Sequence, residues 1–245
     1  MSLRPYLLML LSPVIACAAG TAPPRVFMVG DSTMADKPTD LPERGWGQAL
    51  PAFFTDPTMV QNHAVNGRST KSFIDEGRWQ KVLDELQPGD FVIIQFGHND
   101  EKKEDPARYT DPAASFRDNL RRFVREARAK RAVPVLATPV CRRKFDDAGN
   151  LVDTHGAYPD AVRAVAREEK VPLLELERAT AAMLRKAGPE ESKKLFMWIE
   201  PGKYAKLPDG SRDDTHFVEA GARQVAALAV EEIRALKLPL ANWLK

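Results

Sequence analysis

Five short apolar runs along the chain have the length and composition of buried β-strands. The clearest covers residues 91–96 and follows a Pro88-Gly89-Asp90 turn. The other four runs lie before and after it, and each is separated from the next by a longer, more polar segment. The predicted strands cover residues 25–30, 58–64, 91–96, 133–138 and 171–174.

Helical patterns lie between these runs. Phe116, Leu120, Phe123 and Ala127 are spaced so that they share one helix face. Residues 158–169, 177–187 and 222–236 are also predicted as helices, whereas residues 203–214 read as a long polar loop. Alternating strands and helices imply parallel strands joined by right-handed crossovers. We therefore predict an α/β fold, a three-layer α/β/α arrangement with a five-stranded parallel sheet.

Composition supports a single folded core. The 245 residues are 44% hydrophobic and 29% charged, with a net charge of +2. A disordered chain would be less apolar and less balanced in charge. The charge balance argues against a nucleic-acid binder, and two cysteines are too few for a disulfide scaffold. No apolar run approaches the about 18 residues of a transmembrane helix.

The N-terminus has the features of an export signal. Arg4 precedes an apolar stretch over residues 6–16, and small residues follow at 16–20. The alternative is a buried N-terminal helix, which Pro13 disfavours. Val14-Ile15-Ala16-Cys17 also fits a bacterial lipobox, with a lipid anchor at Cys17, and the sequence leaves ordinary cleavage equally open. We expect a signal peptide over 1–20, a linker over 21–24 and one domain over 25–245, exported to the periplasm, secreted or lipid-anchored.

Polar segments follow three of the predicted strands and precede the last helix. They are Gly30-Asp31-Ser32-Thr33, Asn66-Gly67-Arg68-Ser69, Gly97-His98-Asn99-Asp100 and Asp213-Asp214-Thr215-His216. Ligands of open α/β sheets bind at the carboxyl ends of the strands. The sequence therefore predicts that these segments converge on one edge of the sheet.

The converging residue types are those of a serine hydrolase. Ser32 needs an adjacent base to act as a nucleophile, and His216 could be that base, oriented by Asp213. The backbone N–H groups of Ser32 and Gly67 and the Asn99 amide are candidate oxyanion donors. Each segment also has a structural reading, since Asp31-Ser32 and Asn99 suit turns and Asp-x-x-His suits a helix start. No metal or cofactor is expected.

The four segments resemble the motifs of the SGNH (GDSL-type) hydrolases. The resemblance extends over about residues 25–235 to the rhamnogalacturonan acetylesterases of carbohydrate esterase family twelve, through Gly45-Trp46-Gly47-Gln48, residues 62–69, 97–100, 153–156 and 198–202. It implies a flavodoxin-like fold, Ser32, Asp213 and His216 as the triad, and Ser32, Gly67 and Asn99 as the oxyanion hole. It also implies removal of acetyl groups from pectic polysaccharide and export. Asn66 departs from the glycine common there.

Further residues are candidates for binding an acidic polysaccharide. A galacturonate carboxylate could pair with a guanidinium at the catalytic edge, although a solvated charge run is the alternative reading. Trp198 could be a sugar platform or a core residue, His98 a structural histidine, and His155 a cleft or helix-start residue. The candidates are Arg68, His98, Arg142, Arg143, His155 and Trp198.

Other functions remain open from the sequence. Another SGNH carbohydrate acetylesterase, a lipase or a thioesterase would share the same motifs. A metal-dependent phosphoesterase would need several convergent His or carboxylate ligands, and the chain has only four histidines. A polysaccharide-binding protein without activity would not need the set of Ser32, Asp213 and His216.

Overall fold

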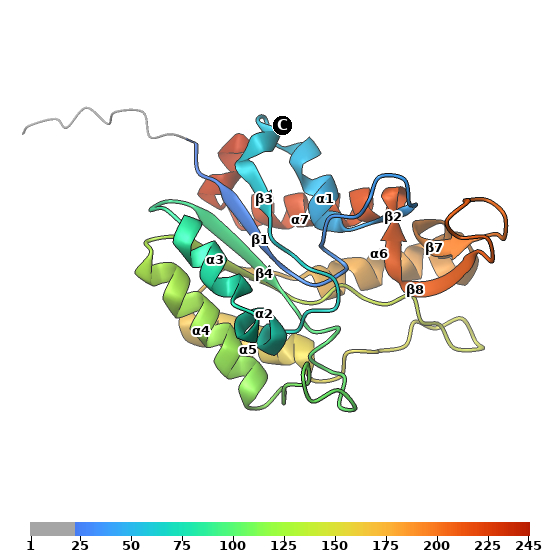
Figure 1. Cartoon of the computed structure of the whole chain (residues 1–245), viewed down its shortest axis with the longest axis horizontal. Helices are drawn as coiled ribbons and strands as arrows, with labels where there is room; N and C mark the ends of the chain where they lie inside the picture. Colours follow the sequence, from blue (N-terminus) through green and yellow to red (C-terminus); the bar gives the residue numbers. More distant parts are fainter. Residues whose placement is uncertain (1–22) are drawn as a thin grey trace, which may run out of the picture.

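The computed structural model describes residues 23–245 (Figure 1). The predicted signal peptide over 1–20 lies outside the described residues, as do the first two residues of the predicted linker. A five-stranded parallel sheet has the strand order β3-β1-β4-β5-β6, which confirms the predicted fold. Its strands are β1 (Val26–Gly30), β3 (Val60–Asn62), β4 (Phe91–Gln95), β5 (Val133–Ala137) and β6 (Leu173–Leu174).

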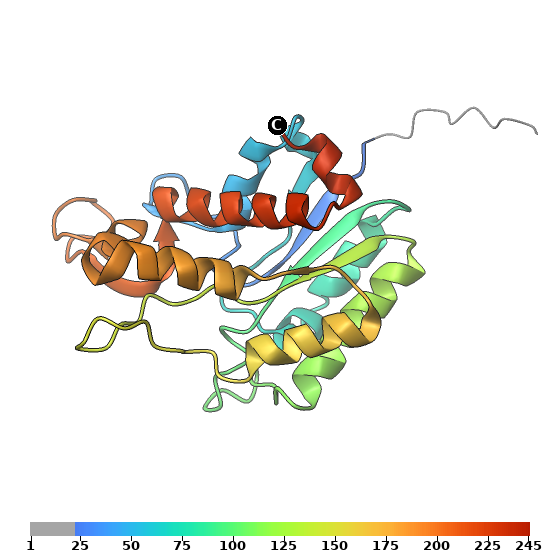
Figure 2. The same ribbon diagram turned by 180° about the vertical axis from the view of Figure 1, so that it is seen from behind.

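Helices cover both faces of this sheet, so the predicted three layers are confirmed (Figures 1 and 2). Alternate residues of β1 contribute to the two sides: Val26 and Met28 pack in one apolar cluster, and Phe27 and Val29 in the other. The first cluster includes α1 (Trp46–Ala49), α6 (Leu176–Glu191) and α7 (Glu219–Ala235), and the second α2 (Thr70–Asp75), α3 (Arg78–Glu85), α4 (Ser115–Ala129) and α5 (Tyr158–Glu169).

Several of these helices follow the predicted pattern closely. The four apolar residues that predicted a helix around 116–127 are all buried on α4. Within α6 the backbone leaves helical geometry at Gly188, which has a φ of +71° and is followed by Pro189. The predicted end at residue 187 therefore coincides with this kink. Four short 3₁₀ turns, η1 (Leu50–Phe53), η2 (Pro57–Met59), η3 (Ser192–Leu195) and η4 (Pro239–Trp243), complete the helical segments of residues 23–245.

A second, antiparallel sheet was not predicted. It has the order β2-β8-β7 and consists of β2 (Glu43–Arg44), β7 (Phe196–Ile199) and β8 (Ser211–Val218). The predicted polar loop over 203–214 is therefore wrong beyond residue 210. The pattern missed β8 because its residues 211–216 are polar, and among its eight residues Phe217 alone is fully buried.

The strand order places a reversal next to β1. The chain passes from β1 to β3 on one side and then returns to β4 on the other side of β1. At such a switch point the loops after the two neighbouring strands diverge and leave a crevice that binds ligands. The loops after β1 and β4 hold Ser32 and Asn99. No helix within residues 23–245 is long and apolar enough to cross a membrane.

Candidate active site

Ser32 lies in a tight turn that begins where β1 ends. The buried carboxylate of Asp31 accepts hydrogen bonds from the Thr33 amide at 2.9 Å and from the Thr33 hydroxyl at 2.7 Å. The N–H of Ala35 donates to the Asp31 carbonyl at 3.0 Å, so the backbone makes one helical turn around Ser32. A Cβ on Gly30 would lie 2.7 Å from the Gln95 carbonyl oxygen, so glycine is needed for β1 to lie this close to β4.

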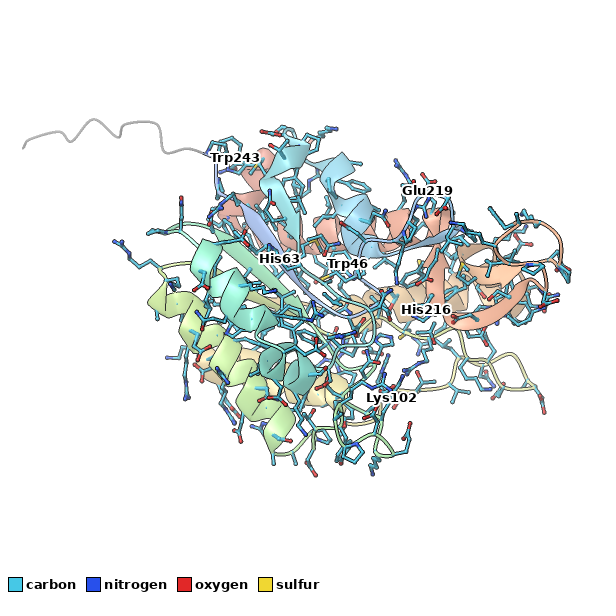
Figure 3. All side chains as sticks on the ribbon, in the orientation of Figure 1. Trp46, His63, Lys102, His216, Glu219 and Trp243 are labelled. Atoms are coloured by element: carbon cyan, nitrogen blue, oxygen red, sulfur yellow. The ribbon has the colours of Figure 1, made fainter. Side chains whose placement is uncertain are left out.

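Helix α1 packs directly against this turn. The Trp46 amide donates to the Thr33 carbonyl at 2.9 Å, and the Trp46 indole donates to the Gln95 side chain at 2.7 Å. The Gln95 amide then donates to the Thr33 hydroxyl at 2.9 Å. Trp46, labelled in Figure 3, is fully buried and belongs to the apolar core. These contacts give the Gly45-Trp46-Gly47-Gln48 motif a structural role in holding the turn of Ser32.

His216 and Asp213 come from an irregular stretch of β8. Met197 of β7 lies opposite Asp213 while Phe196 lies opposite Phe217, so the residues between them form a bulge. The Asp213 carboxylate holds this bulge by accepting from the amides of Thr215 at 2.7 Å and His216 at 3.1 Å. The spacing of three residues thus places the carboxylate and the imidazole of one strand against each other.

The side chains of Ser32, His216 and Asp213 form a continuous chain of contacts. Nδ1 of His216 lies 2.7 Å from Oδ2 of Asp213, and Nε2 lies 2.8 Å from Oγ of Ser32. Partial burial favours the neutral acid of Asp213, but the hydrogen bonds from His216 and the two amides outweigh it and lower the pKa of this carboxyl. A carboxylate so placed can hold the tautomer in which Nε2 accepts a proton from Ser32.

Asp214 points to the opposite side of β8. Its Oδ1 accepts from Arg143 Nη1 at 2.5 Å and from the Trp198 indole at 2.7 Å. The structure therefore brings Asp213, and not Asp214, to the imidazole.

Gly67 and Asn99 lie in the loops after β3 and β4. Gly67 has a φ of +73° in a turn over residues 65–68. The Asn99 amide nitrogen donates to the Arg68 carbonyl at 3.1 Å, which ties the two loops together, and Arg108 Nη1 lies 3.3 Å from Asn99 Oδ1. One of the two Asn99 amide hydrogens makes the bond to Arg68, which leaves the second for a ligand.

Beneath Asn99, the next residue anchors the same loop. The Asp100 carboxyl is buried and accepts hydrogen bonds from the Thr70 hydroxyl at 2.5 Å and the Thr110 hydroxyl at 2.7 Å, as well as from the Thr70 amide. Burial raises the pKa of Asp100 to about 7, although these hydrogen bonds act in the opposite direction. The loop carrying Asn99 is thereby fixed to the start of α2.

Two of the predicted substrate-binding residues, His98 and His155, are inside the protein. Nδ1 of His98 lies 3.3 Å from the buried Asp31 carboxylate, and burial lowers the pKa of His98 to about 4, so the ring is neutral at pH 7. His155 has its ring nitrogens 2.9 Å from Glu101 Oε2 and 2.9 Å from the Val140 carbonyl oxygen. Both side chains are only 3% exposed, so the predicted direct contact with substrate is wrong, and the two histidines instead support the surrounding loops.

The predicted arginines hold other parts of the protein. Arg143 is 6% exposed and pairs with Asp214. Arg142 pairs with Glu101, and Arg68 pairs with Glu76 at 3.0 Å. Each guanidinium has a carboxylate partner on a neighbouring segment, which the sequence pattern alone does not reveal. The predicted substrate contact is wrong for Arg143, because this side chain is buried, and it stays a prediction for the partly exposed Arg68 and Arg142.

Three cationic side chains lie close to the half-buried ring of Trp198. The guanidinium carbons of Arg143 and Arg212 lie 4.7 Å and 5.2 Å from its ring centroid, and Lys193 Nζ lies 4.6 Å from it. Cations over an aromatic ring are attracted by its quadrupole. The structure therefore makes Trp198 a support for these cations and for Asp214, and its role as a sugar platform stays a prediction.

Three residues near the site have no role in the sequence-based prediction. Gln95 and Lys37 are buried polar side chains, and Arg108 faces Asn99. The sequence could have revealed Gln95, because a glutamine inside the apolar run of β4 must find hydrogen-bond partners when it is buried. Lys37 and Arg108 lie in polar loops and give no such signal.

Residues 23–245 contain no cluster of side chains suited to bind a metal ion. No three His, Cys, Asp or Glu side chains of this part of the chain lie close enough together to hold a metal ion. The phosphoesterase alternative therefore lacks the ligand cluster that it requires.

Comparisons with known proteins agree with this geometry. Residues 28–224 match the sequence profile of the GDSL-like Lipase/Acylhydrolase family. The chain is 45% identical over 223 residues to the rhamnogalacturonan acetylesterase RhgT of Bacillus subtilis (strain 168), covering 91% of this chain and 94% of that protein. It is 35% identical over 218 residues to the probable rhamnogalacturonan acetylesterase YesY of the same organism, covering 88% and 94%.

Solved structures share the fold. The structure of protein YXIM from Bacillus subtilis superposes with a TM-score of 0.75 at 28% identity, covering 89% of this chain and 58% of that longer one. Axe2, an acetylxylan esterase from Geobacillus stearothermophilus, superposes with a TM-score of 0.58 at 17% identity, covering 86% of this chain and 94% of that chain. The second likeness concerns the fold alone.

Proposed function

The chain belongs to the GDSL-like lipase/acylhydrolase family and is a carboxylic ester hydrolase; we propose that it removes O-acetyl groups from rhamnogalacturonan through an acyl-enzyme on Ser32. The observation that carries the mechanism is the chain of contacts from Ser32 Oγ to His216 Nε2 at 2.8 Å and from His216 Nδ1 to Asp213 at 2.7 Å. A binding protein would not require this arrangement.

In the acylation step, Ser32 Oγ attacks the carbonyl carbon of the acetyl ester. The hydroxyl proton passes to Nε2 of His216, and Asp213 stabilises the imidazolium that forms. The C–O bond to the sugar then breaks, and the sugar oxygen takes the proton from Nε2. The products of this step are the free sugar hydroxyl and an acetyl ester on Ser32.

The tetrahedral intermediate places a negative charge on the former carbonyl oxygen. We assign its stabilisation to the backbone N–H groups of Ser32 and Gly67 and to the second amide hydrogen of Asn99. Removal of one such donor typically costs about 10²–10³ in turnover. The contacts of Asn99 with Arg68 and Arg108 hold its amide in one orientation before the substrate arrives.

In the deacylation step, a water molecule replaces the sugar. His216 takes a proton from the water, the water oxygen attacks the acetyl carbon, and the same donors stabilise the second tetrahedral intermediate. The bond to Ser32 Oγ then breaks, the serine regains its proton from His216, and acetate leaves. No metal or cofactor takes part in this scheme.

Two named relatives support the pectic substrate. Their similarity extends over about nine-tenths of the chain. The test is release of acetate from acetylated rhamnogalacturonan, acetylated xylan and p-nitrophenyl acetate by the wild-type protein and by Ser32→Ala. We expect preference for rhamnogalacturonan and loss of all three activities in Ser32→Ala.

The outcomes separate mechanism from substrate. Near-normal turnover by a folded Ser32→Ala variant would refute the acyl-enzyme. A preference for acetylated xylan would keep the mechanism and replace the substrate, and a preference for long-chain esters would favour a lipase or thioesterase.

We also propose that the protein is exported, on the basis of the sequence at residues 1–20. Mass spectrometry of the mature N-terminus tests this. A diacylglyceryl-modified Cys17 would establish a lipid anchor, and a free N-terminus beyond Cys17 would establish ordinary cleavage. An unprocessed Met1 in the native host would contradict export.

A further inference from the structure

The ammonium group of Lys37 is buried beside the turn of Ser32. Its side chain is 2% exposed, whereas lysines are almost never buried unless they are paired. Nζ lies 2.5 Å from Asn66 Oδ1 and 2.5 Å from Glu43 Oε1. The Gln48 side chain holds the Lys37 backbone on both sides, accepting from its N–H at 3.0 Å and donating to its C=O at 3.0 Å. This cation is therefore fixed in place.

Lys37 and its two side-chain partners come from three segments that carry parts of the site. Lys37 itself follows Ser32 by five residues in the same loop. Glu43 belongs to β2 and lies opposite Val218 of β8, the strand that carries His216. Asn66 directly precedes Gly67. One ammonium group thus connects the segments that hold the serine, the base and a candidate oxyanion donor.

Asn66 and Gly67 occupy the two central positions of the turn over residues 65–68. The N–H of Arg68 lies 3.3 Å from the Val65 carbonyl oxygen, and the positive φ of Gly67 matches the third position of a type II turn. Glycine at that position is also compatible with a type I turn, in which the central peptide is rotated by about 180°. The N–H of that peptide belongs to Gly67, so the turn sequence alone leaves its direction unspecified.

Contacts with the rest of the protein select one of the two directions. Lys37 holds the side chain of Asn66, and Arg68 Nη1 donates to the Asn66 carbonyl oxygen at 2.8 Å. Because the C=O and N–H of one peptide point in opposite directions, a partner on the carbonyl also fixes the amide. Arg68 is itself held by Glu76.

We propose that Lys37 is a positioning residue that acts through Asn66 and Glu43 to keep the Gly67 N–H aligned with Ser32. This rests on the proposed role of Gly67 as an oxyanion donor. The bond to Asn66 also gives a reason for the asparagine at a position where similar enzymes often have glycine.

The experiment compares Lys37→Met, Asn66→Ala and the double variant with p-nitrophenyl acetate as substrate. Misplaced groups cost less than deleted ones, so we expect kcat of each single variant to fall about tenfold, with KM changed less than about twofold. The kcat of the double variant should equal that of the single variant with the lower kcat, because both changes break the same contact. A control is Lys206→Met, since Lys206 pairs with Asp40 on the exposed surface of the same loop.

Stability is measured alongside turnover. Asn66 is exposed and Glu43 is partly exposed, so both can be hydrated when Lys37 is replaced. If Lys37→Met does not fold, Asn66→Ala carries the test on its own. A kcat within about twofold of the wild type in folded Lys37→Met or in Asn66→Ala would overturn the proposal, as would multiplicative losses in the double variant. Ser32→Ala is assayed in parallel: an active Ser32→Ala would instead refute the proposed function.

Discussion

The substitution Asp213→Asn should abolish turnover while leaving the fold of β8 intact. The side-chain carbonyl oxygen of the introduced asparagine can still accept the two amides that the Asp213 carboxylate accepts at 2.7 Å and 3.1 Å. The amide nitrogen would then face Nδ1 of His216, 2.7 Å from the present carboxylate oxygen. An NH₂ group there donates to Nδ1, so the ring proton moves to Nε2, which can no longer accept the proton of Ser32.

The expected loss is large because the wrong tautomer blocks the first proton transfer. The same substitution in an established serine triad costs about 10⁴ in kcat. At about 1.4 kcal/mol per factor of ten, this is about 5–6 kcal/mol of lost transition-state stabilisation. Since the backbone amides keep their acceptor, the loss of stability should stay at or below about 0.5 kcal/mol. At about 2–4 °C for each 1 kcal/mol in a domain of this size, the thermal midpoint should fall by at most about 1–2 °C.

Asp214→Asn is the matched control on the same strand. Asp214 pairs with Arg143, whose side chain is 7% exposed, and accepts from the Trp198 indole. Asparagine keeps an acceptor but loses the charge, which we expect to cost about 1–2 kcal/mol because the Asp214 side chain is 35% exposed. The control should therefore unfold about 2–8 °C lower and retain most of its turnover.

The assay is steady-state hydrolysis of p-nitrophenyl acetate with the thermal midpoint of the same preparations. Asp213→Asn should have the larger loss of turnover, and Asp214→Asn should have the larger drop in thermal midpoint. Equal losses of turnover, or a larger loss in Asp214→Asn, would refute the assignment of Asp213 as the residue that orients the base.

Three further predictions concern pH, metal and salt. Buried His98 has a pKa of about 4, so protonating it between about pH 6.5 and 4 favours the unfolded state, and the free energy of unfolding rises with pH over this range. Buried Asp100 has a pKa of about 7, so ionising it favours the unfolded state, and the free energy of unfolding falls with pH over the same range. The two contributions therefore oppose each other. Asp100→Asn should reveal the His98 contribution as a slope that decreases from about 1.2 kcal/mol per pH unit at pH 5 to about 0.7 kcal/mol per pH unit at pH 6.5 in denaturant titrations. A slope unchanged from that of the wild type would contradict the assigned pKa values. Dialysis against a chelator should leave esterase activity unchanged, whereas loss with recovery on adding a divalent ion would favour metal chemistry. Because Arg68, Arg142 and Arg143 are already paired, KM for acetylated rhamnogalacturonan should change less than about threefold between about 0.01 M and 0.15 M salt, and a steep rise would reveal a free cationic site.

The central sheet could be predicted from the sequence because its inner strands β1 and β4 are buried on both faces. All five residues of β1 and of β4 are buried, so these strands read as continuous apolar runs. The second sheet could not be predicted for the opposite reason. The residues of β8 before Phe217 are polar and partly exposed, and its regular pairing is interrupted by the bulge that carries Asp213 and His216.

The same distinction applies to the site. Placement at strand ends was sufficient to predict which segments meet, since chain topology decides it. Residue type was not sufficient to predict which charges remain free. Arg143 and His155 are residue types that commonly contact substrates. In this protein Arg143 pairs with Asp214, 71 residues away along the chain, and His155 contacts Glu101, 54 residues away.

The serine and its base are carried by two different sheets. Ser32 follows β1 in the interior of the parallel sheet, and His216 lies on β8, which pairs with β2 and β7 and not with β1. The 2.8 Å contact between them therefore depends on how the two sheets pack, mainly through α1 and α7. Local opening of a smaller unit requires less free energy than global unfolding. A displacement of the antiparallel sheet relative to β1 would thus separate His216 from Ser32 and inactivate the enzyme, even where the turn of Ser32 keeps its own hydrogen bonds.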